Sequence, residues 1–536
     1  MSIGMEQYYT DKGDTWPKIL KYNYEKYGDQ RIAMRQKHYG IWQSFTWKDY
    51  YLHVKKLAIG LLSEGMESGE KVIIMGDNAP QYYYADLAVQ ANRGVSVCLY
   101  SELTPEEIKY AAENSEASFV IVDGQEQVDK FLLIKDDIHF LKRVIFWNYK
   151  GLAHYNDPIL TGYEQILYGG EEYESSHPGI FEQNMENGKA DDICAIVYTS
   201  GTTGDFPKGA IHTFKTMMAG SAYHLSLDPW KENDNVIPYV PPAWMTEQWF
   251  SVGCHLLSGC ILNIAESTET QQRDMRETNP SIVIYDARLW ESQAADVQAR
   301  ILGSDFIKRI AFHKLMPIGH RLADIKQRNQ MPGISLKILY FFADILMFRH
   351  IRKRLGFSNA RICYTSGTTL SPDAFRFFHA LNLPLKSFYW STEGGALSGA
   401  MNSDISFDTV GPVHEGAEVK ITEDNELVYR QAGTFVGYQK DPERTSQVLK
   451  DGWFYSGDSA VIRDDKHIVF LDRMEDLITL SNGNKLASQL IESRLRISPH
   501  IRDAWVFGYP DRDFLIAVVV INYDNVSRWA GQNRVP

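Results

Sequence analysis

The chain has 536 residues, of which 44% are apolar, and its formal net charge is −13. This length is too great for one compact core, so two or more domains are expected. The negative charge argues against nucleic acid as a general partner, because phosphate binding needs a broad basic surface.

The five cysteines form no Cys-x-x-Cys pair. This pattern favours a reducing compartment and argues against a disulfide scaffold or a zinc site. The first residues lack a basic region followed by an apolar core, so no secretory signal is expected. No uncharged apolar run reaches the length of roughly 18 residues that a spanning helix needs. We therefore expect a cytoplasmic protein, and the sequence predicts no oligomeric state.

The first 400 residues alternate between strand-like and helix-like stretches. Strands are expected at 71–75, 95–99 and 118–123, and helices at 80–92 and 105–114. This rhythm predicts parallel sheets that are covered by helices on both faces.

One later segment, 334–355, joins an apolar run to a basic cluster that includes Arg349 and Arg354. Basic and apolar residues at helical spacing suit a helix that lies at a membrane surface. We favour the other interpretation, a half-buried helix with a solvated basic end. Peripheral membrane contact stays open.

From about Asp404 the chain changes to short strands and turns, which predicts a β-rich subdomain over about 404–471. Residues 472–536 then contain a strand, a turn, a helix and two further strands. The expected fold class is α/β. We expect a large N-terminal domain at 1–471, made of helix-covered parallel sheets and the β-rich subdomain. A small α+β C-terminal domain, which is incomplete, is expected at 472–536.

The most informative stretch, 198–209 (YTSGTTGDFPKG), follows an apolar run that is expected to form a buried strand. Its glycines let backbone N–H groups approach a ligand, its hydroxyls donate hydrogen bonds, and its lysine neutralises charge, which suits a polyphosphate. It is not a Walker A loop, because no Gly-Lys-Ser/Thr ending follows. A flexible Gly/Ser/Thr loop is the alternative, and five further motifs downstream argue against it.

The six motifs, taken in order, identify the chain as similar to the adenylate-forming superfamily, and within it to bacterial long-chain-type fatty acyl-CoA ligases. The motifs are 198–209, 241–248 (PPAWMTEQ), 366–370 (SGTTL), 389–393 (YWSTE), 452–458 (GWFYSGD) and 471–478 (LDRMEDLI). The resemblance runs from about residue 10 to the last residue. It implies a large N-terminal domain, a hinge and a small mobile C-terminal domain.

This resemblance implies an AMP-forming acyl-CoA synthetase, which uses ATP, Mg²⁺ and CoA. A carboxylate and ATP would form acyl-AMP and pyrophosphate, and CoA would then form the thioester and release AMP. Two alternatives stay open. One is a catalytically impaired relative that binds nucleotide or acyl groups, and the other is an acyl-AMP ligase that loads a carrier protein.

Adenylation joins two anions, so its site must place cations and N–H donors around the phosphates. The resemblance assigns the β- and γ-phosphates to Thr199, Ser200, Gly201, Thr202, Thr203, Gly204 and Lys208. Phe206 is an extra residue relative to the family's Gly-x-Pro-Lys-Gly pattern, and we expect it to shift Lys208 along the loop.

Thr392 and Glu393 resemble the family's pair that contacts the α-phosphate and holds Mg²⁺. A carboxylate oxygen suits this hard cation. With Lys208, these two residues are the predicted catalytic residues.

The remaining ligand contacts implied by the resemblance concern adenosine and CoA. Gly367 and Thr368 would lie against adenine, Asp458 would accept both ribose hydroxyls, and Arg473 would close on the ribose from the other side. Gly483 would let pantetheine approach closely.

Two features depart from the long-chain members. Trp390 stands where they carry glycine, which predicts a short acyl pocket; the alternative is an indole turned into the core that leaves a long channel. Trp244 is assigned to the acid substrate together with Trp390. The family's C-terminal lysine is expected beyond Pro536, so the chain is either a fragment or naturally shortened.

Overall fold

The computed structural model describes residues 11–199, 206–328, 330–368 and 370–533. The chain divides into two compact units. The first comprises Met1–Thr270, Thr392–Gly395 and Gln431–Gly452, and the second comprises Gln271–Ser391, Ala396–Arg430 and Trp453–Pro536.

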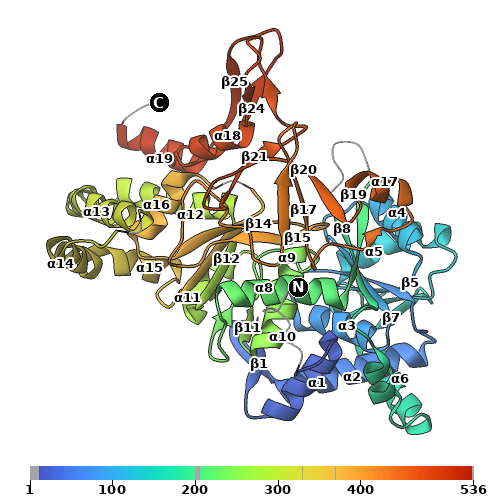
Figure 1. The fold of residues 1–536 in the computed structure, drawn as a ribbon. Helices are drawn as coiled ribbons and strands as arrows, with labels where there is room; N and C mark the ends of the chain where they lie inside the picture. Colours follow the sequence, from blue (N-terminus) through green and yellow to red (C-terminus); the bar gives the residue numbers. More distant parts are fainter. Residues whose placement is uncertain (1–10, 200–205, 329, 369, 534–536) are drawn as a thin grey trace. The chain divides into compact units, whose positions relative to one another are not determined.

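The first unit contains an eight-stranded sheet with the order β18-β9-β8-β4-β3-β5-β6-β7 (Figure 1). Strands β3 to β8 pair in parallel, whereas β9 and β18 are antiparallel to their neighbours. The strands are β3 (Lys71–Met75), β4 (Val95–Leu99), β5 (Ala117–Val122), β6 (Arg143–Phe146), β7 (Leu160–Gly162), β8 (Ile193–Thr199), β9 (Lys208–Thr213) and β18 (Gly437–Tyr438).

Helices cover both faces of this sheet because the strand side chains alternate between them. On one face, Ile73, Val97 and Val120 form a buried cluster with Ala111 of α4 and Phe131 of α5. On the other face, α3 packs against β3, β4 and α2. The helices of this unit include α1 (Trp16–Tyr27), α2 (Trp47–Ser63), α3 (Pro80–Ala91), α4 (Pro105–Ser115), α5 (Gln125–Ile134), α6 (Tyr163–Ser176), α7 (Ile180–Asn187), α8 (Phe214–Leu227) and α17 (Pro442–Val448).

Four further strands of the first unit form a second sheet in the order β10-β11-β1-β2. They are β10 (Asn235–Val236), β11 (Ile261–Ile264), β1 (Ile32–His38) and β2 (Ile41–Thr46). The segment between β10 and β11 forms α9 (Met245–Glu247), the π-helix η3 (Gln248–Cys254) and α10 (His255–Ser258).

In the second unit, β12 (Ile282–Asp286), β13 (Ile362–Ser366) and β14 (Leu385–Ser391) pair in parallel. The other strand of this group, β15 (Gly395–Gly399), follows β14 in the sheet. The accompanying helices are α11 (Gln271–Thr278), α12 (Ala287–Leu302), α13 (Phe306–Gln327), α14 (Ile334–Ala343), the π-helix η4 (Asp344–Phe348), α15 (Arg349–Leu355) and α16 (Pro372–Ala380).

The expected β-rich region is present and antiparallel. It consists of β16 (Glu418–Ile421), β17 (Glu426–Arg430), β20 (Trp453–Ile462) and β21 (Ile468–Arg473). Beyond it lie β22 (Ile478–Thr479), β23 (Lys485–Leu486), α18 (Ser488–Arg496), β24 (Ile501–Gly508), β25 (Leu515–Ile521) and α19 (Tyr523–Asn533). The predicted α/β fold class is therefore confirmed, while the separate domain at 472–536 stays a prediction.

Candidate active site

The predicted phosphate loop connects the buried strand β8 to β9. The two strands are antiparallel, and Thr199 pairs with Lys208 across them. The Thr199 hydroxyl donates to the Lys208 carbonyl at 3.5 Å. The loop residues predicted to bind phosphate lie outside the described residues, so their role stays a prediction: Ser200, Gly201, Thr202, Thr203 and Gly204.

Phe206, the extra residue of this loop, stacks on the ring of Tyr110 in α4. The ring centroids lie 4.5 Å apart and the planes are 15° from parallel. Offset stacking of this kind stabilises an aromatic pair by about 0.5–1.5 kcal/mol. Phe206 is thus attached to α4 two residues before Lys208, which begins β9.

Glu393 is held by a residue that the sequence did not indicate. Its carboxylate accepts a hydrogen bond from the Tyr438 hydroxyl at 2.8 Å, and its carbonyl accepts one from the Phe435 N–H at 2.7 Å. Tyr438 belongs to β18, where it pairs with Ala210 of β9. Because Ala210 is two residues beyond Lys208, this chain of contacts brings the predicted metal ligand to the strand that begins with the predicted phosphate-binding lysine.

Thr392 lies beside a histidine that is buried in the first unit. Burial lowers the pKa of His212 to about 3, and a hydrogen bond with the Thr392 backbone opposes this effect. The His212 ring also lies 3.2 Å from the Thr216 hydroxyl, measured from Nδ1 to Oγ1. Burial therefore keeps the His212 imidazole neutral beside Thr392.

Trp244 is the N-cap residue directly before the short helix α9, and its side chain is half-buried. Its ring lies edge-on to Tyr100, with centroids 6.5 Å apart and planes at 89°. A π-helix, η3, follows directly; such turns occur frequently at functional sites. Burial raises the pKa of Glu247, the last residue of α9, to about 7, although a hydrogen bond from Ser251 opposes the effect.

Asp458 and Arg473, the predicted ribose-binding residues, are brought together in the second unit. They are paired across β20 and β21, and the guanidinium lies 3.0 Å from the carboxylate. Asp458 is buried, and it accepts a further hydrogen bond from the Tyr389 hydroxyl. Burial raises the pKa of Tyr389 well above its ordinary value, which keeps the hydroxyl protonated as a donor.

Trp390 directly follows Tyr389 in β14. Successive side chains of a strand point to opposite faces, so Trp390 lies on the face away from Asp458. Its side chain is half-buried. Tyr389, which supports Asp458, and Trp390, which is assigned to the acid, therefore lie on opposite faces of β14. The pocket-closing role of Trp390 stays a prediction.

Gly367 and Gly483 have backbone angles that only glycine adopts readily, with φ of +90° and +82°. Among the described residues, and apart from the two chain neighbours of each glycine, no heavy atom lies within 4 Å of the position that a Cβ would occupy. The backbone is thus open to an approaching ligand at both places. Thr368 is exposed beside Gly367, and Gly483 lies in the turn between β22 and β23.

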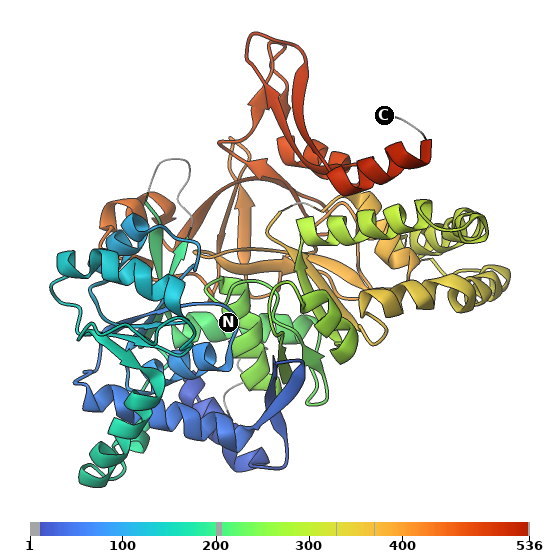
Figure 2. The same ribbon diagram turned by 180° about the vertical axis from the view of Figure 1, so that it is seen from behind.

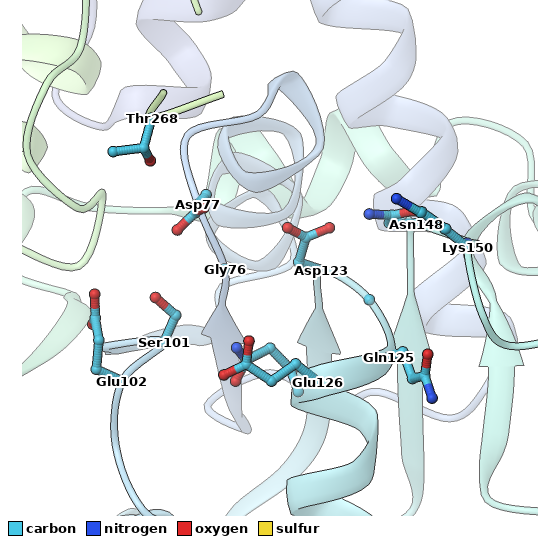
Figure 3. Close-up of a pocket in the computed structure, with 12 residues that line it drawn as sticks. Gly76, Asp77, Ser101, Glu102, Asp123, Gln125, Glu126, Asn148, Lys150 and Thr268 are labelled. Atoms are coloured by element: carbon cyan, nitrogen blue, oxygen red, sulfur yellow. The ribbon is translucent and has the colours of Figure 1, made fainter. Parts of the chain in front are cut away.

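A cavity of about 620 Å³ lies in the first unit at the carboxyl ends of β3 and β5 (Figure 3). After β3 the chain crosses to β4 on one side, and after β5 it crosses to β6 on the other side. Ligands commonly bind in the crevice where two connections diverge in this way. The lining is acidic, and burial raises the pKa of both Asp77 and Asp123. The other charged residues of the lining are Glu102, Glu126 and Lys150. The negative charge of this lining disfavours the binding of a phosphate anion.

The sequence profile of AMP-binding enzymes matches residues 20–438. The chain belongs to the AMP-binding enzyme family. Long chain acyl-CoA synthetase 1 of Arabidopsis thaliana is 30% identical over 527 residues, covering 90% of this chain and 75% of the relative. A long-chain-fatty-acid–CoA ligase of Xenopus laevis is 25% identical over 531 residues, covering 96% of this chain and 70% of the relative.

This AMP-binding enzyme also shares its fold with the A domain of a carboxylic acid reductase from Segniliparus rugosus, whose structure contains AMP and a co-purified carboxylic acid. The TM-score is 0.72 at 16% identity, with 100% of this chain and 89% of that chain covered. The predicted family and fold are therefore confirmed. The ligand assigned to each predicted site residue stays a prediction.

Proposed function

We propose that this AMP-binding enzyme is an AMP-forming acyl-CoA synthetase. A carboxylate oxygen attacks the α-phosphorus of ATP, and the bond to pyrophosphate breaks. The CoA thiol then attacks the acyl carbonyl, its proton is lost to solvent, and AMP leaves. The names of the relatives support this reaction class.

The observation that carries the proposal is the arrangement around Asp458. A buried carboxylate that is anchored by the Tyr389 hydroxyl and paired with Arg473 suits the two hydroxyls of a ribose. Charge-assisted hydrogen bonds from those hydroxyls are stronger than neutral ones. Arg473 is half-exposed, so it can move aside when a nucleotide binds.

Polar and charged side chains of the first unit fit the triphosphate and Mg²⁺. Glu393 offers the hard carboxylate oxygen that Mg²⁺ prefers, and Tyr438 orients it. Lys208 and the Thr199 hydroxyl supply a cation and a donor for phosphate oxygens. When bound, Mg²⁺ would offset the negative charge of the phosphates and so favour attack by a carboxylate.

The length of the acid is the open part of the proposal. The names of the relatives favour a long-chain acid, whereas Trp390, on the face of β14 away from Asp458, favours a short one. We propose Trp390 and Trp244 as the side chains that contact the acid.

The test is a panel of carboxylates from acetate to palmitate, scored by ATP–pyrophosphate exchange and by CoA-dependent release of AMP. Both signals with the same acid support the proposal. Exchange without CoA-dependent release would indicate an acyl-AMP ligase that serves a carrier protein. Neither signal, with AMP binding retained, would indicate a binding protein. The Asp458→Ala variant, which lacks the proposed ribose contact, is the control for signals that do not come from this site.

A further inference from the structure

The helical run 334–355 of the second unit, formed by α14, η4 and α15, carries apolar side chains on two opposite faces. Its inner face is buried and includes Leu336, Ala343 and Phe348. Its outer face is also apolar, although it is in contact with solvent. The exposed fractions are 77% for Ile334, 53% for Ile338, 60% for Phe341, 55% for Phe342 and 67% for Leu346. We call these five residues the apolar ridge.

The position of the ridge is fixed by the fold, because hydrogen bonds hold the buried inner face of the run. The Tyr340 hydroxyl donates to the Ala380 carbonyl at 2.9 Å. Arg352 donates to Asp344 at 2.7 Å and to the Leu381 carbonyl at 2.6 Å. Spacings of three and four residues along a helix place side chains on one face, so the ridge side chains point together away from these contacts.

Basic residues are concentrated in the run and in the neighbouring helix α13. Residues 306–355 contain eleven lysines and arginines and two aspartates, a net charge of +9 in a chain whose total is −13. Exposed basic side chains of the run itself are Lys337, Arg349, Lys353 and Arg354. Helix α13, which carries five of the eleven basic residues, lies beside α14 in both views (Figures 1 and 2).

We propose that the apolar ridge and its basic surroundings dock on the surface of an anionic lipid bilayer. Large contiguous apolar patches are rare on monomeric proteins in water, and aliphatic and phenyl side chains flanked by lysine and arginine are what an anionic interface binds. No helix in the described parts of the chain is long and apolar enough to cross a membrane, so the ridge would lie on the surface.

Charge decides between a lipid surface and a second copy of this chain as the occupant. Two copies of the segment facing each other would oppose +9 to +9, and like charges across an interface are strongly unfavourable. An anionic bilayer complements both the ridge and its charge. The inference does not depend on the proposed reaction.

The experiment measures sedimentation of the full chain with two kinds of vesicle, one of phosphatidylcholine alone and one of equal parts phosphatidylglycerol and phosphatidylcholine. Binding is expected to the anionic vesicles and should weaken as salt is raised. The ridge variant Phe341→Ser with Phe342→Ser should lose about tenfold or more in vesicle affinity. The charge variant Lys353→Ala with Arg354→Ala should lose about thirtyfold.

Two matched controls carry the same changes elsewhere. Lys189→Ala with Lys215→Ala removes two exposed charges, and Met401→Ser with Val461→Ser removes two exposed apolar side chains. Both should bind like the wild type. In the wild-type protein, hydrogen exchange over 334–355 should slow when anionic vesicles are present, a result that requires no variant.

Three results would overturn the proposal. One is a wild-type chain that binds neither kind of vesicle. Another is binding that both the ridge and the charge variants retain. The third is a ridge variant that turns an oligomer into a monomer and leaves vesicle binding unchanged, because the occupant would then be a second copy.

Discussion

Arg496 of α18 and Glu291 of α12 form an ion pair that is buried from solvent. The guanidinium lies 2.9 Å from the carboxylate, and the side chains are 7% and 1% exposed. Glu492 and Asp503 lie 3.7 Å from the same guanidinium. One arginine therefore lies against three carboxylates and joins α18 to α12 within the second unit.

Removing this arginine should destabilise the second unit. Arg496→Met leaves the buried Glu291 carboxylate without its cation, which typically costs about 3–5 kcal/mol in the free energy of unfolding. Urea denaturation measures the loss. Arg494→Met, at an exposed arginine of the same helix, is the control and should cost less than about 0.5 kcal/mol. An Arg496→Met protein as stable as the control would show that the cluster contributes nothing.

Nucleotide affinity should depend on Asp458 and on the hydroxyl that holds it. Asp458→Ala should weaken AMP binding by about 1–3 kcal/mol, because two charge-assisted hydrogen bonds to the ribose are lost. Tyr389→Phe should cost roughly 1 kcal/mol by releasing the carboxylate. Calorimetry with AMP gives both values, and Asp465→Ala, at an exposed turn, is the control. Unchanged affinity in Asp458→Ala refutes the ribose assignment.

The acids accepted should change when Trp390 is shortened. With the indole in the acyl pocket, a longer acid cannot gain the roughly 0.8 kcal/mol that each buried methylene provides. Trp390→Gly should therefore raise kcat/KM for longer acids and lower it for short ones. The same substitution at the exposed Trp505 controls for a loss of stability. If the wild type prefers palmitate and Trp390→Gly keeps that profile, Trp390 packs in the core.

Stability should fall as pH rises through the range in which Asp86 ionises. Burial raises the pKa of this α3 carboxyl to about 6, although hydrogen bonds that include one from the Gln90 amide oppose the effect. The folded chain therefore holds a proton that the unfolded chain releases near pH 4. The contribution of Asp86 to stability is largest below that pH and is lost up to about pH 6, by on the order of 3 kcal/mol.

The Asp86→Asn variant cannot ionise at this position, so this part of the pH dependence should disappear. Urea unfolding at several pH values between about pH 4 and about pH 8 compares it with the wild type. Asp191→Asn, at an exposed aspartate, should keep the wild-type slope. Parallel stability curves for wild type and Asp86→Asn would mean that Asp86 is already ionised in the folded chain.

The sequence by itself determined the family, the alternation of strands and helices, and the strands that lead into the phosphate loop, because hydrophobic periodicity and motif order are properties of neighbouring residues. Only the tertiary structure decided which side chains support the predicted ones. Tyr438 reaches Glu393 from 45 positions away, and Tyr389 lies 69 positions from Asp458. No local pattern links such pairs.

The same limit explains the helical run 334–355. The sequence predicted a half-buried helix with a solvated basic end, and its inner face is indeed buried while its basic end is exposed. The apolar pattern could not say that Phe341 and Phe342 face solvent. Burial of one helix face depends on which other segments pack against it. Here the carbonyl groups of Ala380 and Leu381 hold the inner face. The position of these groups is decided by the fold as a whole.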